Sequence, residues 1–456
     1  MKSVDFFEYL WYHNYGDRSM KRKIYDKLLN WKNNYEGKSL MVMGARQVGK
    51  TYIIDKFCQN EFENYVSINL FERKDIIDLY KTRLTSQEKF IKLKSYVGFD
   101  IEKENTCLFI DEIQESEELI SELKYFSEKH PNIKIICSGS LLGIKFKRSS
   151  FSFPVGKVKM IKMYPMNFEE FLNAFGEDEL IKEIRYSFEN NKTMLEARHE
   201  KALNYYRLYL CSGGMPDSVK KMVASGGDVT KYDRSVITDI IESYFSDMNK
   251  YVTSNNEAIK IEKIYSSIPS QLTGSSNKFQ YKKLDENARS RDYESALDWL
   301  LASGVILESF EVSAPNIPLK GFENRDVFKI FYNDIGIFTK SLKILSNDII
   351  TDNISLYKGA IAESYVANEL SSTGSDLYYW ESSGTAEIDF LLYNNDGIIP
   401  VEVKSSDNTK SKSLQTYMKT FNPKYGIRIS AKNFGFVNNI KSVPLYAVFC
   451  LGKGDN

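Results

Sequence analysis

The sequence has few residues that bind metals through sulfur or imidazole. Among its 456 residues are five cysteines and three histidines. The cysteines are odd in number and scattered, without zinc-site spacing, and some fall in apolar runs expected to form core strands. We therefore expect reduced structural thiols and a reducing cytoplasm, with no metal or general-base role for the isolated histidines. These residues are Cys58, Cys107, Cys137, Cys211 and Cys450, and His13, His130 and His199.

An excess charge of either sign is also missing. Lysine plus arginine and aspartate plus glutamate both number 61, so the formal net charge is zero. No overall field then favours nucleic acid or an anionic membrane, and contact with DNA has to come from local patches. No window approaches a membrane span or a signal peptide, so we expect no membrane contact. The 42% hydrophobic content suits several packed domains.

One short segment fits the phosphate-binding pattern G-x-x-x-x-G-K-[ST], directly after the apolar run Ser39–Met43. Glycines let backbone N–H groups curl around an anion, Lys50 supplies charge for the outer phosphates, and Thr51 offers Mg²⁺ a hydroxyl. The alternative is an ordinary glycine turn between a strand and a helix. We expect ATP with Mg²⁺ here, and GTP stays open. The segment is Gly44, Ala45, Arg46, Gln47, Val48, Gly49, Lys50 and Thr51.

A second apolar run, residues 106–110, ends in Asp111 and Glu112. Its length favours a buried parallel strand, and acids at the carboxyl end of such a strand face the ligand crevice. We expect Asp111 to hold Mg²⁺ and Glu112 to polarise the water that attacks the γ-phosphate. Solvated acids capping a strand are the alternative, but the phosphate loop upstream favours the site.

A third predicted strand, residues 133–137, runs into Ser138-Gly139-Ser140. A hydroxyl at this place would emerge beside the γ-phosphate, so Ser138 or Ser140 is a candidate phosphate sensor. Ser-Gly-Ser is equally ordinary turn chemistry, and both interpretations stay open.

Apolar runs alternate with amphipathic helical stretches between residues 39 and 165, which predicts an α/β fold with a parallel sheet between helices. We expect an N-terminal helical segment at 1–38, a P-loop core at 39–165 and a helical lid region at 166–257. Residues 258–314 contain two predicted helices and a strand, which suggests a winged helix. Its basic residues could contact a DNA backbone, or the fold could be a structural adapter with solvated charges. These basic residues are Lys282, Lys283, Arg289 and Arg291.

The last predicted domain, 315–456, contains a β-hairpin around the turn at residues 394–397. A symmetric turn places Asp389 opposite Glu402 and Glu387 opposite Lys404, on one polar face. Hard carboxylate oxygens and a lysine on one face suit metal-dependent phosphodiester cleavage, and Glu363 on the preceding helix could complete the metal shell. A salt-bridged, solvated hairpin face is the alternative.

The sequence resembles a family of prokaryotic AAA-type ATPases in which a P-loop domain precedes a C-terminal domain of unknown function. The resemblance implies an AAA-like parallel sheet. It rests on Lys21-Arg22-Lys23, residues 44–51, Asp111-Glu112-Ile113-Gln114, Ser138-Gly139-Ser140, residues 164–171, Gly213-Gly214-Met215-Pro216 and Asp334-Ile335-Gly336.

The segment from Glu363 through Asp389 to Glu402-Val403-Lys404 resembles the PD-(D/E)xK restriction-endonuclease fold, with Ile-Asp-Phe in place of Pro-Asp. Such domains are active nucleases or inert relics. One departure from the ATPase family is Lys157, where an arginine is usual. Lysine cannot make a bidentate fork with phosphate, so an arginine-finger role is in doubt, with Arg148 as a substitute.

Our preferred hypothesis is an ATP-hydrolysing switch that moves a winged helix and a Mg²⁺-dependent nuclease on nucleic acid, with DNA as the expected partner. One alternative is a non-nucleolytic regulator whose C-terminal fold only docks a partner or DNA. Another is an assembly ATPase that forms homo-oligomers without nucleic acid. The predicted catalytic residues are Lys50, Glu112, Asp389, Glu402 and Lys404, and the predicted metal ligands are Thr51, Asp111, Glu363, Asp389 and Glu402.

Overall fold

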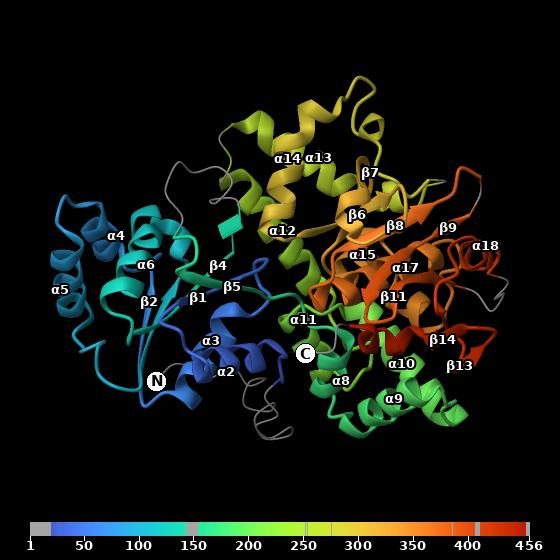
Figure 1. Cartoon of the computed structure of the whole chain (residues 1–456), viewed down its shortest axis with the longest axis horizontal. Coiled ribbons are helices and arrows are strands. Elements are labelled where there is room, and N and C mark those ends of the chain that lie inside the picture. The colour runs from blue at the N-terminus through green and yellow to red at the C-terminus, as the bar shows by residue number, and fades with distance from the viewer. Residues whose placement is uncertain are drawn as a thin grey trace. The chain divides into compact units, whose positions relative to one another are not determined.

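The computed structural model describes residues 20–140, 142–143, 154–250, 252, 254–274, 276–384, 386–405 and 411–452. The chain divides into two compact units (Figure 1). The parallel-sheet unit contains Arg22–Tyr164 and Asp298–Gly304, and the mixed-sheet unit contains Pro165–Leu297 and the described residues from Val305 onward. Among the described helices, none combines the length and apolar character needed to cross a membrane.

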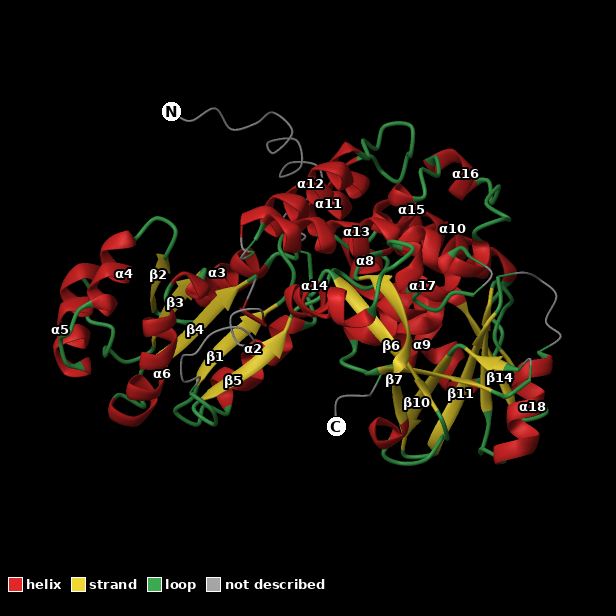
Figure 2. Cartoon of the chain, turned by 90° about the horizontal axis from the view of Figure 1, so that it is seen from above, coloured by secondary structure: helices red, strands yellow, loops and turns green. Residues whose placement is uncertain are grey.

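The parallel-sheet unit is built on five parallel strands in the order β2-β3-β4-β1-β5 (Figure 2). The strands are β1 (Ser39–Met43), β2 (Asn64–Asn69), β3 (Thr106–Asp111), β4 (Lys134–Gly139) and β5 (Val158–Lys162). The helices are α2 (Ile24–Asn33), α3 (Lys50–Glu61), α4 (Lys74–Lys81), α5 (Ser86–Val97), η1 (Ile113–Glu115) and α6 (Glu117–Lys129). The predicted parallel sheet is confirmed.

Alternate residues of β3 show why helices cover both faces of this sheet. Leu108 and Ile110 belong to a buried cluster with side chains from α4, α5 and α6. Cys107 points the opposite way, and its Sγ lies 3.7 Å from Sγ of Cys58 on α3. All six residues of β3 are buried, as expected for a central parallel strand, and the strand thereby fixes the position of the acid at its end.

The mixed-sheet unit begins with helices and ends in two sheets. Its helices are α8 (Phe168–Ala174), α9 (Asp178–Asn190), α10 (Glu196–Ser212), α11 (Pro216–Ala224), α12 (Ser235–Lys250), α13 (Asn255–Leu272), η2 (Tyr281–Lys283), the first part of α14 (Ser290–Ser303), η3 (Leu319–Phe322), α15 (Ile335–Ser341), α16 (Ser346–Ile350), α17 (Lys358–Ser372), α18 (Lys412–Phe421) and η4 (Leu445–Leu451). The predicted helical region after residue 165 is therefore present.

The two sheets of this unit have the strand orders β7-β6-β8-β9 and β10-β11-β12-β14-β13. Their strands are β6 (Ile306–Val312), β7 (Glu323–Tyr332), β8 (Leu377–Glu381), β9 (Glu387–Ile388), β10 (Phe390–Asn394), β11 (Gly397–Val403), β12 (Gly426–Ser430), β13 (Gly435–Val437) and β14 (Ile440–Pro444). Helix α17 contacts β6, β7 and β8 of the first sheet and β11 of the second.

The strand pairing crosses the domain boundary predicted at residues 314/315. Strand β6 lies before this boundary, yet it pairs in parallel with β8 and antiparallel with β7, both of which lie after it. The two predicted helices of the winged helix are present as α13 and α14, but the strands that follow them belong to a larger sheet. The winged helix predicted at 258–314 therefore stays a prediction, and β6 shares its sheet with strands from beyond residue 314.

Candidate functional site

The phosphate-loop segment leaves β1 and enters α3 through backbone conformations that favour glycine. Gly44 has φ 153°, and a Cβ added there would lie 2.2 Å from the carbonyl oxygen of Met163. Gly49, the N-cap of α3, has φ 90°. The first glycine thus permits close packing on the chain after β5, and the second permits the turn into the helix.

Lys50 folds back over this loop. Its Nζ donates to the carbonyl oxygens of Gly44 at 3.0 Å and Ala45 at 2.8 Å, and its side chain is buried. The ammonium is thereby held above the bend formed by residues 44–49. This is the place that the sequence pattern assigns to the outer phosphates of a nucleotide.

Arg22 is a supporting residue that the sequence reasoning did not single out. Its Nη1 donates to the carbonyl oxygen of Val48 at 2.9 Å, and its Nη2 donates to that of Tyr164 at 2.7 Å. The guanidinium thereby ties the loop to the chain that follows β5. The basic triplet at residues 21–23 was the only signal in the sequence, and it did not show which residue is buried.

Asp111 at the end of β3 connects the loop to β4. Its Oδ2 accepts a 2.8 Å hydrogen bond from Thr51 Oγ1, and its Oδ1 accepts from Ser138 Oγ and, at 3.0 Å, from the backbone N–H of Glu112. Residues from three separate parts of the sequence therefore meet at one carboxylate. The predicted convergence of loop and acid is present, and the hydroxyl and carboxylate oxygens form a donor set that fits Mg²⁺.

Glu112 lies beside this group in a left-handed backbone conformation with φ 55° and ψ 41°. Its Oε2 accepts a hydrogen bond from Gln114 Nε2. Burial raises the pKa of Glu112, and the hydrogen bond from the Gln114 amide opposes that rise. The negative charge of Asp111 raises the pKa of Glu112 further. The carboxyl is thus within the group of residues around Asp111, as a water-activating base would have to be.

The comparison with known families agrees with this geometry. Residues 36–172 match the family model of an AAA domain. The parallel-sheet unit holds an AAA-type P-loop ATPase domain. The match covers the strands and acids described above.

Two further matches have no assigned function. Residues 203–348 match a domain of unknown function (DUF8612), and residues 358–448 match another (DUF4143). The first runs through the predicted winged helix, and the second contains the predicted nuclease-like residues. No curated protein matches the sequence.

Several solved structures are similar over most of their length. The Walker-type ATPase PABY2304 of Pyrococcus abyssi is 16% identical, with coverage of 72% of this chain and 96% of that chain, at a TM-score of 0.44. Aeropyrum pernix ORC1 in complex with DNA is 10% identical (73% and 92%, TM-score 0.28). Cdc6p from Pyrobaculum aerophilum is 13% identical (75% and 95%, TM-score 0.25). These scores do not extend the assignment beyond the AAA domain.

The C-terminal hairpin has the predicted register over part of its length. Phe390 pairs with Val401, in the register that also aligns Asp389 with Glu402, and Asp389 Oδ2 accepts a 2.7 Å hydrogen bond from the backbone N–H of Val403. Pairing between β10 and β11 stops there, because the chain bends at Asp389 and β9 joins β8 in the other sheet.

The predicted pairing of Glu387 with Lys404 is therefore wrong. Glu387 lies opposite Glu381 of β8, on a different sheet from Lys404. The expectation of an open polar face is also wrong for Glu402, which is 2% exposed. Its Oε1 lies 2.8 Å from Lys404 Nζ, and its buried Oε2 has no hydrogen-bond partner among the residues that the structure describes.

Lys329 on β7 provides a cation that the sequence reasoning did not foresee. Its fully buried Nζ lies 2.7 Å from Glu363 Oε1 and 2.6 Å from Glu387 Oε1. Burial alone would lower the pKa of Lys329, but the charges of Glu363, Glu387 and Asp389 outweigh this and raise it. The lysine thus remains charged among the acids, and we call these four residues the Lys329 cluster.

The remaining members of the cluster are partly satisfied by other groups. Glu363 Oε2 accepts a 2.9 Å hydrogen bond from Asn277 Nδ2. Burial and the charge of Glu363 raise the pKa of Asp389, whereas Lys329 and the N–H of Val403 act in the opposite direction. Within the described part of the chain, the ligand atoms of three or more acids, histidines or cysteines come within 4.8 Å of one another only at Glu196, His199 and Glu200.

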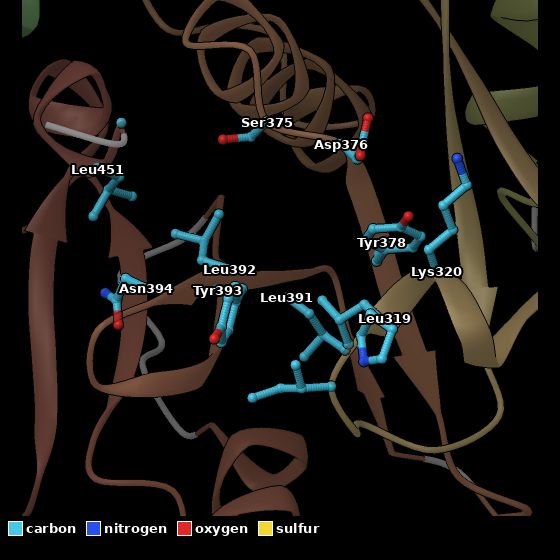
Figure 3. A pocket seen from close by; sticks show the side chains of 13 residues that line it. Leu319, Lys320, Ser375, Asp376, Tyr378, Leu391, Leu392, Tyr393, Asn394 and Leu451 are labelled. Atoms are coloured by element: carbon cyan, nitrogen blue, oxygen red, sulfur yellow. The ribbon is translucent and has the colours of Figure 1, made fainter. Parts of the chain in front are cut away.

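A pocket of about 400 Å³ lies elsewhere in the mixed-sheet unit (Figure 3). Its lining comes from the region of η3, the start of β8 and strand β10, and includes Lys320, Asp376, Tyr378, Leu391 and Tyr393. None of the predicted nuclease residues lines it, so this pocket is not the predicted nuclease site.

Of the two arginine-finger candidates, Lys157 lies within the described residues. Lys157 precedes β5, and its Nζ lies 3.3 Å from Glu128 Oε1 of α6. Arg148 lies outside the described residues.

Proposed function

We propose that this chain binds ATP and hydrolyses it at the AAA domain. The observation that carries the proposal is the 2.8 Å hydrogen bond between Thr51 Oγ1 and Asp111 Oδ2, because it brings the phosphate loop to the predicted magnesium-binding carboxylate. Thr51 and Asp111 would hold the ion, directly or through water, where it would neutralise charge on the β- and γ-phosphates.

The roles of the other residues follow from their chemistry. Lys50 would exchange its two bonds with loop carbonyl oxygens for charge-assisted bonds to phosphate oxygens, which are stronger. Glu112 would accept the proton of the attacking water, and Ser138 would keep Asp111 oriented through Oδ1. Loop glycines leave room for the phosphates beside the N-terminus of α3, where backbone N–H groups favour an anion.

The experiment compares ATP hydrolysis and ATP binding in the wild type, Lys50→Ala and Lys56→Ala. Both lysines lie on α3, but Lys56 is outside the loop, so it serves as a matched control. We expect Lys50→Ala to lower kcat by on the order of 100-fold or more, with Lys56→Ala close to the wild type. Unchanged turnover in Lys50→Ala contradicts the proposed site.

For the C-terminal region, we propose a nucleotide-dependent switch that docks a partner and does not cleave nucleic acid. Lys329 supports this because its ammonium is fully buried and lies between Glu363 and Glu387, where it neutralises carboxylates that a metal would otherwise have to balance. A lysine in this place also competes electrostatically with a divalent cation. The acids then act as a structural ion cluster.

The nuclease predicted from the sequence is the second candidate, and one observation favours it. Glu402 Oε2 is buried next to Lys404 and finds no hydrogen-bond partner in the described part of the chain, and such an acceptor is suited to a cation. Plasmid DNA incubated with Mg²⁺ or Mn²⁺ and ATP separates the two candidates. Nicking by the wild type that is lost in Asp389→Ala would establish the nuclease, whereas intact plasmid in every condition supports the switch.

DNA as the docked partner is part of the same proposal. Lys282, Lys283, Arg289 and Arg291 are exposed around η2 and the start of α14, where they can reach phosphates. The logarithm of the affinity for duplex DNA should fall linearly with the logarithm of the salt concentration. Replacing two of these residues should reduce the steepness of that line by about 2. Absence of salt-sensitive binding would favour a protein partner.

A further inference from the structure

We propose that Gln114 is a positioning residue that holds Glu112 in place for ATP hydrolysis, and that Gly139 of β4 makes room for it. The inference rests on the proposed hydrolysis at the AAA domain. Gln114 is 1% exposed in the short helix η1, two residues after Glu112. Its Nε2 donates to Glu112 Oε2, so the amide directly restrains the carboxylate.

The local backbone explains why these two side chains meet. Glu112 adopts a left-handed conformation that non-glycine residues rarely take, and the chain turns sharply from β3 into η1. The turn is fixed by backbone hydrogen bonds from Glu115 N to Glu112 O at 3.0 Å and from Ser116 N to Ile113 O at 3.1 Å. Such conformations persist where the surroundings hold them, often at functional sites.

Two consecutive residues of strand β4 lie against Asp111 and Gln114. Ser138 donates directly to Asp111 Oδ1. At the next residue, a Cβ added to Gly139 would lie 2.2 Å from Gln114 Oε1, so any larger side chain would displace the amide. The Ser-Gly pair therefore supports Asp111 directly and supports Glu112 through Gln114.

The chemistry of the amide fits this role. A carboxylate only accepts hydrogen bonds, so the Gln114 Nε2 donor can hold Oε2 of Glu112 in a fixed direction. Loss of the donor should therefore free the Glu112 carboxylate to turn away from the attacking water.

The experiment measures kcat and KM for ATP in the wild type, Gln114→Leu, Gln114→Asn and Gly139→Ala. We expect Gln114→Leu to lower kcat by on the order of 10- to 100-fold, with KM within about twofold of the wild type. Gly139→Ala should do the same because it displaces the amide, and Gln114→Asn, which keeps an amide donor, should lie between.

A double variant tests whether the two residues act together. If Gly139 acts through Gln114, the double variant Gln114→Leu/Gly139→Ala should be no slower than the slower single variant. A normal kcat in a folded Gln114→Leu protein would overturn this inference while leaving ATP hydrolysis established. Normal hydrolysis by Lys50→Ala would instead overturn the proposed site itself.

Discussion

Replacement of Lys329 by methionine tests whether the Lys329 cluster is structural. The substitution keeps the length of the side chain and its contact with Tyr379, whose ring centroid lies 4.7 Å from Nζ. It removes the cation that lies 2.7 Å from Glu363 and 2.6 Å from Glu387. Removing one partner of a buried ion pair costs about 3 to 5 kcal/mol, because the other charge is left buried and unpaired.

The structure places the expected loss at the lower end of this range. The Glu387 side chain is 35% exposed and can regain water, and Glu363 keeps its 2.9 Å hydrogen bond from Asn277. We therefore expect the mixed-sheet unit to lose about 3 kcal/mol of unfolding free energy at pH 8. That corresponds to roughly 100-fold faster amide exchange through unfolding.

The pH dependence has a definite sign. Burial and the charge of Glu363 already raise the pKa of Asp389, and without Lys329 the charge that opposes this rise is lost, so the folded state binds more protons than the unfolded state. Stability then rises as the pH falls through the folded pKa, and the deficit of Lys329→Met should be smaller at pH 5 than at pH 8. If these acids formed a metal site in which Lys329 had no role, the deficit of Lys329→Met would not depend on pH in this way.

Hydrogen exchange with mass spectrometry is the appropriate assay, because it reports peptides of β7, β9 and β11 separately from the parallel-sheet unit. Lys320→Met, at an exposed lysine of η3, is the matched control. The double variant Lys329→Met/Glu363→Gln should recover part of the loss. Less than about threefold faster exchange in Lys329→Met at pH 8, or an equal deficit at both pH values, would refute the structural role.

Three further predictions concern the AAA domain. Gly44→Ala should destabilise it by at least about 2 kcal/mol, because the new Cβ meets the Met163 carbonyl oxygen. Thermal unfolding measures this loss, and an unchanged midpoint would show that the packing at Gly44 is unimportant. Arg22→Lys should weaken ATP binding about tenfold by calorimetry, since one ammonium cannot reproduce the fork to the Val48 and Tyr164 carbonyl oxygens; unaltered affinity would show that the loop needs no such brace. Chelation of Mg²⁺ should stop ATP turnover, and turnover that persists in excess chelator would remove the role assigned to Thr51.

The AAA domain could be predicted in detail because its signals are contiguous. Residues 44–51 form one pattern, and the acids stand at the end of a short apolar run, so strand and site follow from local sequence. The register of the hairpin between β10 and β11 was also predictable, since a two-residue turn at Asn395 and Asp396 determines which residues face each other.

The features that the sequence did not predict depend on contacts between distant segments of the chain. Lys329 precedes Glu363 by 34 residues and lies in a strand whose other residues are apolar near its end, so nothing local distinguishes it from a solvated lysine. Arg22 likewise reaches Tyr164, 142 residues away. The bend at Asp389 has no glycine or proline to mark it, and pairing with β8 decides it.

The bend at Asp389 also has a practical consequence for dissecting this protein. Strands β9 and β10 form one stretch of chain that leaves one sheet and enters the other, and β6 supplies a neighbour for β8 from far upstream. Shortened versions that start after residue 314 would lack β6 and expose an unpaired edge of β8, inviting aggregation. Expression of the C-terminal portion by itself should therefore begin before Ile306.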